Sequence, residues 1–191
     1  MSTVGHDRST YLAWRQRFLP SPIRLIVVAE SPPDGGLYFY RTDGSHTGET
    51  LFREMMMAIG ATPASKAEGL EKFRAAGLLL VDATYTPVNK GYAPARRREI
   101  IEDGYPALVA DLRSLMGGRR VPVVVIKTTL CDLLVPRLKA NGFDLLNSPA
   151  IRPPFPSDGN QPKFRAQFGE ALRLAEQKTA MDVDSAYRDN P

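Results

Sequence analysis

Acidic and hydroxyl side chains directly follow the first strongly apolar segment of the sequence. Residues 23–29 are apolar except for Arg24, a pattern typical of a buried parallel strand, and Glu30, Ser31, Pro32 and Pro33 come next. Proline fixes the backbone angle φ and lacks an amide donor, so this turn is stiff and can hold a carboxylate in place. We therefore expect a ligand site here. The alternative is that Glu30 only caps a helix and that the aromatic residues after it belong to the core.

Two later segments carry polar groups in comparable positions. Asp82 ends the apolar segment 77–82, which places a second carboxylate at the end of a strand, although a turn residue or helix cap is an equally good interpretation. The loop 148–162 is rich in proline, glycine and small polar residues and precedes a helix. Backbone donors and a helix N-terminus favour a phosphate there, with ordinary capping by Ser157 or Asp158 as the alternative.

The elements that would position these groups alternate between strands and helices. Glycines follow several of the apolar-periodic stretches, where left-handed helix ends are expected. This alternation predicts one α/β domain over residues 1–178, a three-layer α/β/α sandwich with a central four-stranded parallel sheet, followed by a polar, flexible tail over 179–191. The expected strands are 23–29, 77–82, 121–127 and 143–147, and the expected helices are 10–18, 49–60, 64–76, 95–116, 130–141 and 163–176.

Three loops rich in proline and glycine extend from the ends of the expected strands: 31–48, 84–94 and 148–162. In open α/β sheets, ligands bind outside the carboxyl ends of the strands. We therefore expect the three loops to meet at one crevice that contains Glu30, Asp82 and the residues near Ser157.

Composition excludes several kinds of site. The 191 residues include one cysteine, Cys131, and two histidines, so an internal disulfide, a four-cysteine zinc site and an all-cysteine iron–sulfur cluster are impossible. The sequence shows neither a leader pattern nor an apolar stretch of the roughly 20 residues that span a membrane, which predicts a cytoplasmic protein without membrane contact. No metal and no cofactor is expected.

The net charge of +4 is compatible with a polyanionic partner but does not require one. Two clusters stand out, namely Lys90 with Arg96, Arg97 and Arg98, and the pair Arg119 and Arg120. Solvated charges on loops and helices are the alternative interpretation of both.

Taken in order, the three loops resemble motifs of the uracil-DNA glycosylase superfamily. Ala29-Glu30-Ser31-Pro32-Pro33 is similar to the first motif, and Gly36-Leu37-Tyr38-Phe39 is similar to the segment that ends in the uracil-stacking phenylalanine. Leu78-Leu79-Leu80-Val81-Asp82-Ala83 is similar to the strand that ends in the asparagine reading the uracil edge, and Phe155-Pro156-Ser157 to the last motif. Phe155 stands where the family carries a histidine, and Ser31 where it commonly carries an aspartate.

This resemblance implies a monomeric DNA repair enzyme that flips uracil out of DNA, hydrolyses the N-glycosidic bond and releases free uracil. It implies catalytic roles for Glu30, Ser31 and Asp82. The base would lie between Pro32, Phe39, Asp82 and Lys127, with Phe39 stacked on the ring and Asp82 at its edge. Donors from the turn after Glu30, or the Lys127 ammonium, would replace the missing histidine.

The resemblance also implies contacts with the DNA backbone. The expected DNA-binding residues are Asn89, Lys90, Arg96, Arg97, Ser157, Asn160, Gln161 and Lys163. Two other classes of function stay open on sequence alone: a DNA or nucleotide-binding protein on the same fold without catalysis, and a small-molecule enzyme that uses Glu30 and Asp82, with or without a metal.

Overall fold

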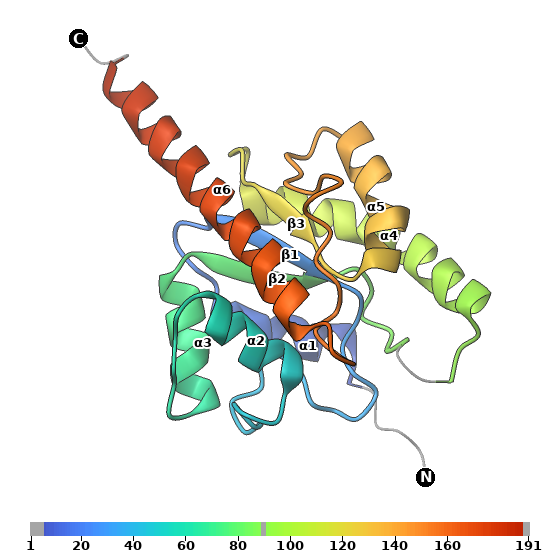
Figure 1. Ribbon diagram of the computed structural model, residues 1–191. Helices are drawn as coiled ribbons and strands as arrows, with labels where there is room; N and C mark the ends of the chain where they lie inside the picture. Colours follow the sequence, from blue (N-terminus) through green and yellow to red (C-terminus); the bar gives the residue numbers. More distant parts are fainter. Residues whose placement is uncertain (1–5, 89–90, 189–191) are drawn as a thin grey trace.

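Three parallel strands form the centre of the computed structural model, which describes the backbone of residues 6–88 and 91–188 (Figure 1). In the described ranges the elements are, in chain order, α1 (Arg8–Gln16), β1 (Leu25–Ala29), α2 (Thr50–Ala58), α3 (Lys66–Ala75), β2 (Leu78–Asp82), α4 (Pro94–Met116), β3 (Val123–Val125), α5 (Thr128–Ala140) and α6 (Gln161–Arg188). The α/β alternation predicted from the sequence is confirmed.

The sheet has the order β2-β1-β3, so the first strand lies in the middle. Ala29 is opposite Asp82, and Val28 is opposite both Val81 and Val125. Every residue of the three strands is buried, as continuous apolar runs require when both faces of a sheet are covered. In Figure 1, α6 passes in front of the sheet and α4 lies behind it.

The predicted fourth strand over 143–147 is not a strand in the described part of the chain. Leu145 makes one parallel bridge to Val123, and the chain then turns away through an isolated antiparallel bridge between Ser148 and Ile151. The Asn147 side chain bonds both the Val125 N–H and the Val125 carbonyl, at 2.8 and 2.9 Å. Since this amide occupies the backbone groups that a longer ladder would use, the pairing stops after one residue.

The helices begin and end close to the predicted positions. Four glycines that follow predicted helices all have positive φ, namely Gly60, Gly77, Gly117 and Gly142. Gly117 forms the left-handed end of α4. The last helix is the exception, because α6 continues to Arg188, past its expected end at residue 176 and into the segment that we predicted to be a flexible tail.

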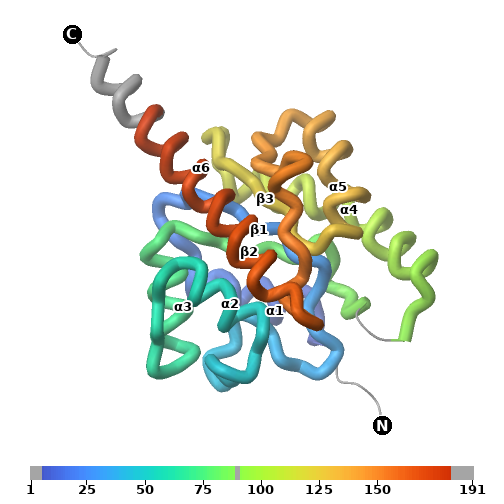
Figure 2. The backbone as a smooth tube through the Cα atoms, in the orientation of Figure 1, coloured from blue at the N-terminus to red at the C-terminus, as the bar shows by residue number. Residues whose placement is uncertain are grey.

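The N-terminal half of α6 packs against α2 (Figure 2). Glu54 of α2 is buried, and it pairs with Arg165 of α6 and with Arg53 of its own helix. A buried carboxylate needs such partners to offset its lost hydration. None of the described helices has the length and apolar character needed to cross a membrane.

Candidate functional site

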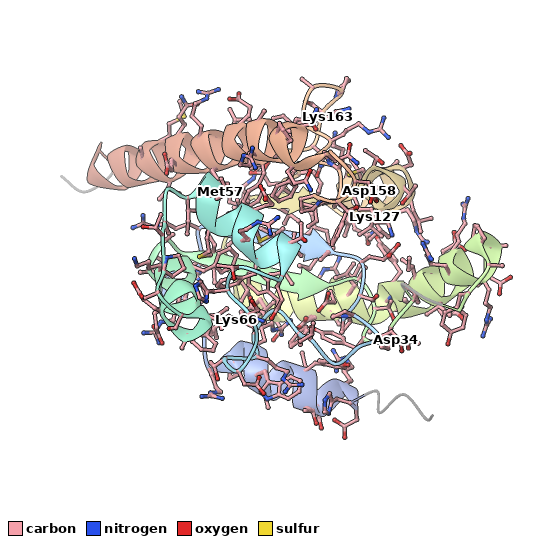
Figure 3. All side chains as sticks on the ribbon, turned by 60° about the horizontal axis from the view of Figure 1, so that its bottom comes forward. Asp34, Met57, Lys66, Lys127, Asp158 and Lys163 are labelled. Atoms are coloured by element: carbon pink, nitrogen blue, oxygen red, sulfur yellow. The ribbon has the colours of Figure 1, made fainter. Side chains whose placement is uncertain are left out.

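A cavity of about 460 Å³ opens at the carboxyl edge of the sheet, beside the last residues of β1 and β2 and the first residue after β3. The arrowheads of β1 and β2 in Figure 3 point toward the side on which Lys127 and Asp158 are labelled. The cavity is lined by the ends of β1 and β2, by residues that follow β1 and β3, by the start of α2, by one arginine of α4 and by the loop before α6. The lining residues are Ala29, Glu30, Ser31, Pro32, Pro33, Leu37, Tyr38, Phe39, Glu49, Thr50, Leu51, Phe52, Leu80, Asp82, Arg97, Ile126, Lys127, Phe155 and Ser157. Residues from the first and third predicted loops therefore meet here, together with Asp82.

An ion pair joins the ends of the first and third strands inside this cavity. The Lys127 Nζ lies 2.5 Å from Glu30 Oε2, and the two side chains are 25% and 11% exposed. The low exposure matters, because a pair shielded from water interacts more strongly than one at an open surface. Both residues were predicted from the sequence as site residues, but their pairing with each other was not predicted.

The backbone of Lys127 is held in an unusual conformation. Its φ is 73°, in the region that favours glycine, between the end of β3 and the first residue of α5. Its N–H donates to the Pro153 carbonyl at 2.8 Å, and its own carbonyl accepts from the N–H groups of Leu130 and Cys131 at 2.9 Å each. Strained positions of this kind gather at binding sites, where surrounding bonds hold them in place.

Asp82 supplies the most perturbed acid of the cavity. The residue is 3% exposed, and its Oδ2 completes no hydrogen bond among the described residues. Burial raises the pKa of this carboxyl group to about 7, while the nearby Tyr38 hydroxyl and the Arg15 guanidinium oppose the shift. The Tyr38 hydroxyl likewise completes no hydrogen bond within the described part of the chain. Two residues that line the cavity thus have polar atoms whose hydrogen-bonding capacity the described residues leave unused.

The Arg15 guanidinium near Asp82 has strong partners of its own. It makes a bidentate pair with Asp111, at 2.6 and 2.8 Å, and donates to the Tyr85 hydroxyl at 3.1 Å. These bonds join α1 to α4 behind the cavity, so Arg15 acts on Asp82 only through its charge.

Ser31, which we predicted to be catalytic, has a hydroxyl that connects two loops. Its Oγ accepts from the Val88 N–H at 3.2 Å and donates to the Pro32 carbonyl at 3.2 Å. The first loop is thereby joined to the loop after β2. Both bonds support a role for Ser31 in positioning the turn that carries Glu30.

Phe39 lines the cavity but is largely covered by other rings. It is 7% exposed and packs at steep angles against Tyr40, Phe52 and Phe73, with ring centroids 5.1 to 5.6 Å apart. Such an aromatic cluster fixes the orientation of the ring. Two exposed apolar side chains also line the cavity, Leu37 at 53% and Phe155 at 40%.

A second buried ion pair borders the cavity, and the sequence analysis missed it. The Lys66 Nζ lies 2.5 Å from Glu49 Oε2 and donates to the Tyr38 carbonyl at 2.8 Å, while Glu49 Oε1 is buried and finds no hydrogen-bond partner among the described residues. Burial lowers the pKa of the Lys66 ammonium, and Glu49 opposes that shift. Glu49 precedes α2 and Lys66 begins α3, so no local sequence signal connects them.

The expected DNA-binding residues fall into separate groups. Ser157 and Arg97 line the cavity. Asn160, Gln161 and Lys163 lie outside the lining, where α6 begins, and Lys163 is exposed and labelled in Figure 3 at that end of the helix. Arg96 is exposed on α4, and Asn89 and Lys90 lie outside the described residues.

In the described ranges, no three histidine, cysteine, aspartate or glutamate side chains come together as a metal site would require. Comparison with known proteins finds no family model that matches the chain, and no curated protein or solved structure that matches it significantly.

Proposed function

We propose that this protein is a DNA glycosylase that binds a flipped uracil nucleotide in the cavity at the carboxyl edge of the sheet and hydrolyses its N-glycosidic bond. One observation carries the proposal. The Glu30 carboxylate and the Lys127 ammonium lie side by side in a cavity that also contains a buried carboxyl group, Asp82.

Fixed opposite charges suit this reaction because its transition state separates charge. As the bond between the sugar C1′ and the uracil N1 breaks, the electron pair leaves with the base, which becomes anionic, and the sugar becomes a cation. Glu30 would stabilise the cationic sugar and take a proton from the attacking water, while Lys127 would stabilise the departing anion. Charges that are already in place need no reorganisation during the reaction.

Asp82 has the properties needed to recognise the edge of the base. Uracil presents both a donor, N3–H, and an acceptor, O4, whereas an ionised carboxylate can only accept. With a pKa of about 7, the Asp82 carboxyl group is partly protonated at neutral pH and can then both accept and donate. Phe39, held by its neighbours, would present part of its ring to the base.

The decisive experiment measures uracil release from a labelled oligonucleotide by purified protein without added metal. We expect release by the unmodified protein and a rate lower by about a hundredfold or more for Glu30→Gln, since general base catalysis contributes on this scale. Glu71→Gln is the matched control, because Glu71 is an exposed glutamate on α3 that pairs with Arg74 outside the cavity. No release above that of a mock preparation would contradict the proposal.

One observation favours a second candidate, a protein that binds DNA or nucleotides on this fold without catalysis. The Glu30 carboxylate is engaged by Lys127, and the Ser31 hydroxyl is engaged by the Val88 N–H, so neither is free in the unliganded cavity. Tight binding of a uracil-containing oligonucleotide with no product after prolonged incubation would select this second function.

A further inference from the structure

Three consecutive arginines near the start of α4 have different environments. Arg96 pairs with Glu99 at 2.9 Å, and Arg98 pairs with Glu102 at 3.0 Å, both within the same helix and exposed. Arg97 has no ion pair among residues 6–88 and 91–188, and its Nε is buried without a hydrogen-bond partner. Only Arg97 of the three lines the cavity.

A buried N–H donor without a partner is costly, because it has lost water and gained nothing in return. In Arg97 this cost falls on the Nε alone, since the residue as a whole is half-buried. In a binding cavity the missing partner is supplied when the ligand enters. A cavity-lining guanidinium that has no ion pair in the described ranges therefore indicates which kind of group the ligand brings to this side of the cavity, namely an acceptor that carries negative charge.

The other charges of the cavity lead to the same conclusion. Glu30 is paired with Lys127, and Glu49 is paired with Lys66. Burial raises the pKa of the Asp82 carboxyl group to about 7, so this group carries only part of a negative charge at neutral pH. Among the described residues that line the cavity, the Arg97 guanidinium is the remaining full charge, which leaves positive charge beside α4 without a counterion there.

We propose that Arg97 binds a phosphate group attached to the nucleoside in the cavity, so that the site takes a phosphorylated nucleotide in preference to a free base or nucleoside. The planar guanidinium presents several N–H donors in a fixed arrangement that matches phosphate oxygens. This inference rests on the proposed nucleotide site and names its substrate class. The phosphate belongs either to a free mononucleotide or to the backbone of a polynucleotide, and the chemistry of recognition is the same.

The test compares the affinities of the full-length protein for deoxyuridine, deoxyuridine 5′-monophosphate and a short single-stranded oligonucleotide that contains uracil, by calorimetry at fixed salt. For Arg97→Ala we expect at least about a tenfold loss of affinity for the phosphorylated ligands and no change for deoxyuridine. Arg97→Lys keeps the charge and loses the planar guanidinium, so its affinity for the phosphorylated ligands should lie between those of Arg97→Ala and the unmodified protein. Arg113→Ala is the control, because Arg113 is an exposed arginine of the same helix outside the cavity.

Each outcome has a defined meaning. A loss confined to the monophosphate identifies a free nucleotide as the ligand, and a loss confined to the oligonucleotide identifies a backbone phosphate; both support the inference. Equal losses for deoxyuridine and its monophosphate, no loss for either phosphorylated ligand, or no binding of either one would overturn it. Uracil release is measured separately, so a protein that binds phosphate through Arg97 but excises nothing refutes only the glycosylase proposal.

Discussion

Asp82 ends β2 with a carboxyl group that is shut off from solvent, and its replacement by asparagine removes the titration while the shape of the side chain is kept. Burial raises the pKa of this group from 3.8 to about 7 in the folded protein. The unfolded chain would ionise near the ordinary value. Between these two pH values the folded state therefore binds more protons than the unfolded state, so stability falls as pH rises through this window.

The expected size follows from the pKa difference. The pKa difference of about three corresponds to a loss of roughly 4 kcal/mol of unfolding free energy, which is complete above pH 7. Something over a third of this loss has already occurred at pH 5. From pH 5 to pH 8 the unmodified protein should therefore lose about 2 to 3 kcal/mol of unfolding free energy that Asp82→Asn does not lose. Each protein is compared with itself at the two pH values. Any pH-independent difference in stability between a neutral acid and an amide at position 82 therefore cancels.

The assay is urea denaturation at pH 5 and pH 8 for both proteins. Asp158→Asn is a control for the same chemical change at an exposed site, where we expect no comparable difference between the two pH values. If the unmodified protein and Asp82→Asn lose the same unfolding free energy between pH 5 and pH 8, the reasoning about the buried carboxyl group is refuted.

Two further substitutions test the packing around the cavity. Gly44→Ala places a methyl group 2.0 Å from Glu49 Oε1, so we expect a loss of about 1 to 3 kcal/mol in urea denaturation. Gly35→Ala is the control, because its added methyl group meets nothing within 4 Å and should leave stability nearly unchanged. Equal losses of stability for the two variants would contradict the expected close contact at Gly44. Tyr40→Phe removes a buried hydroxyl that bonds the Leu80 N–H at 2.7 Å and the Leu80 carbonyl at 3.1 Å. We expect a cost of about 1 to 3 kcal/mol and faster hydrogen exchange of the Leu80 amide, and unchanged exchange would refute this bond.

The location of the cavity could be predicted from the sequence because it depends on local patterns. Continuous apolar runs identified β1, β2 and β3, and parallel strands bring their carboxyl ends to one edge. Polar residues directly after these runs, Glu30 and Asp82, therefore had to lie near each other. The fourth strand was predicted wrongly, because the Asn147 amide occupies the backbone groups of Val125, a contact that local apolar character does not indicate.

Sequence alone thus determined the α/β alternation, the edge of the sheet where the cavity lies and two of its acids, since each follows from short-range periodicity and chain direction. Only the tertiary structure decided how the charges pair. It joined Glu30 to Lys127, left Arg97 without an ion pair in the part of the chain that the structure describes, and removed Asp82 from water. These outcomes depend on distances between segments far apart in the chain and on the exclusion of solvent, and neither quantity is contained in the local order of residues.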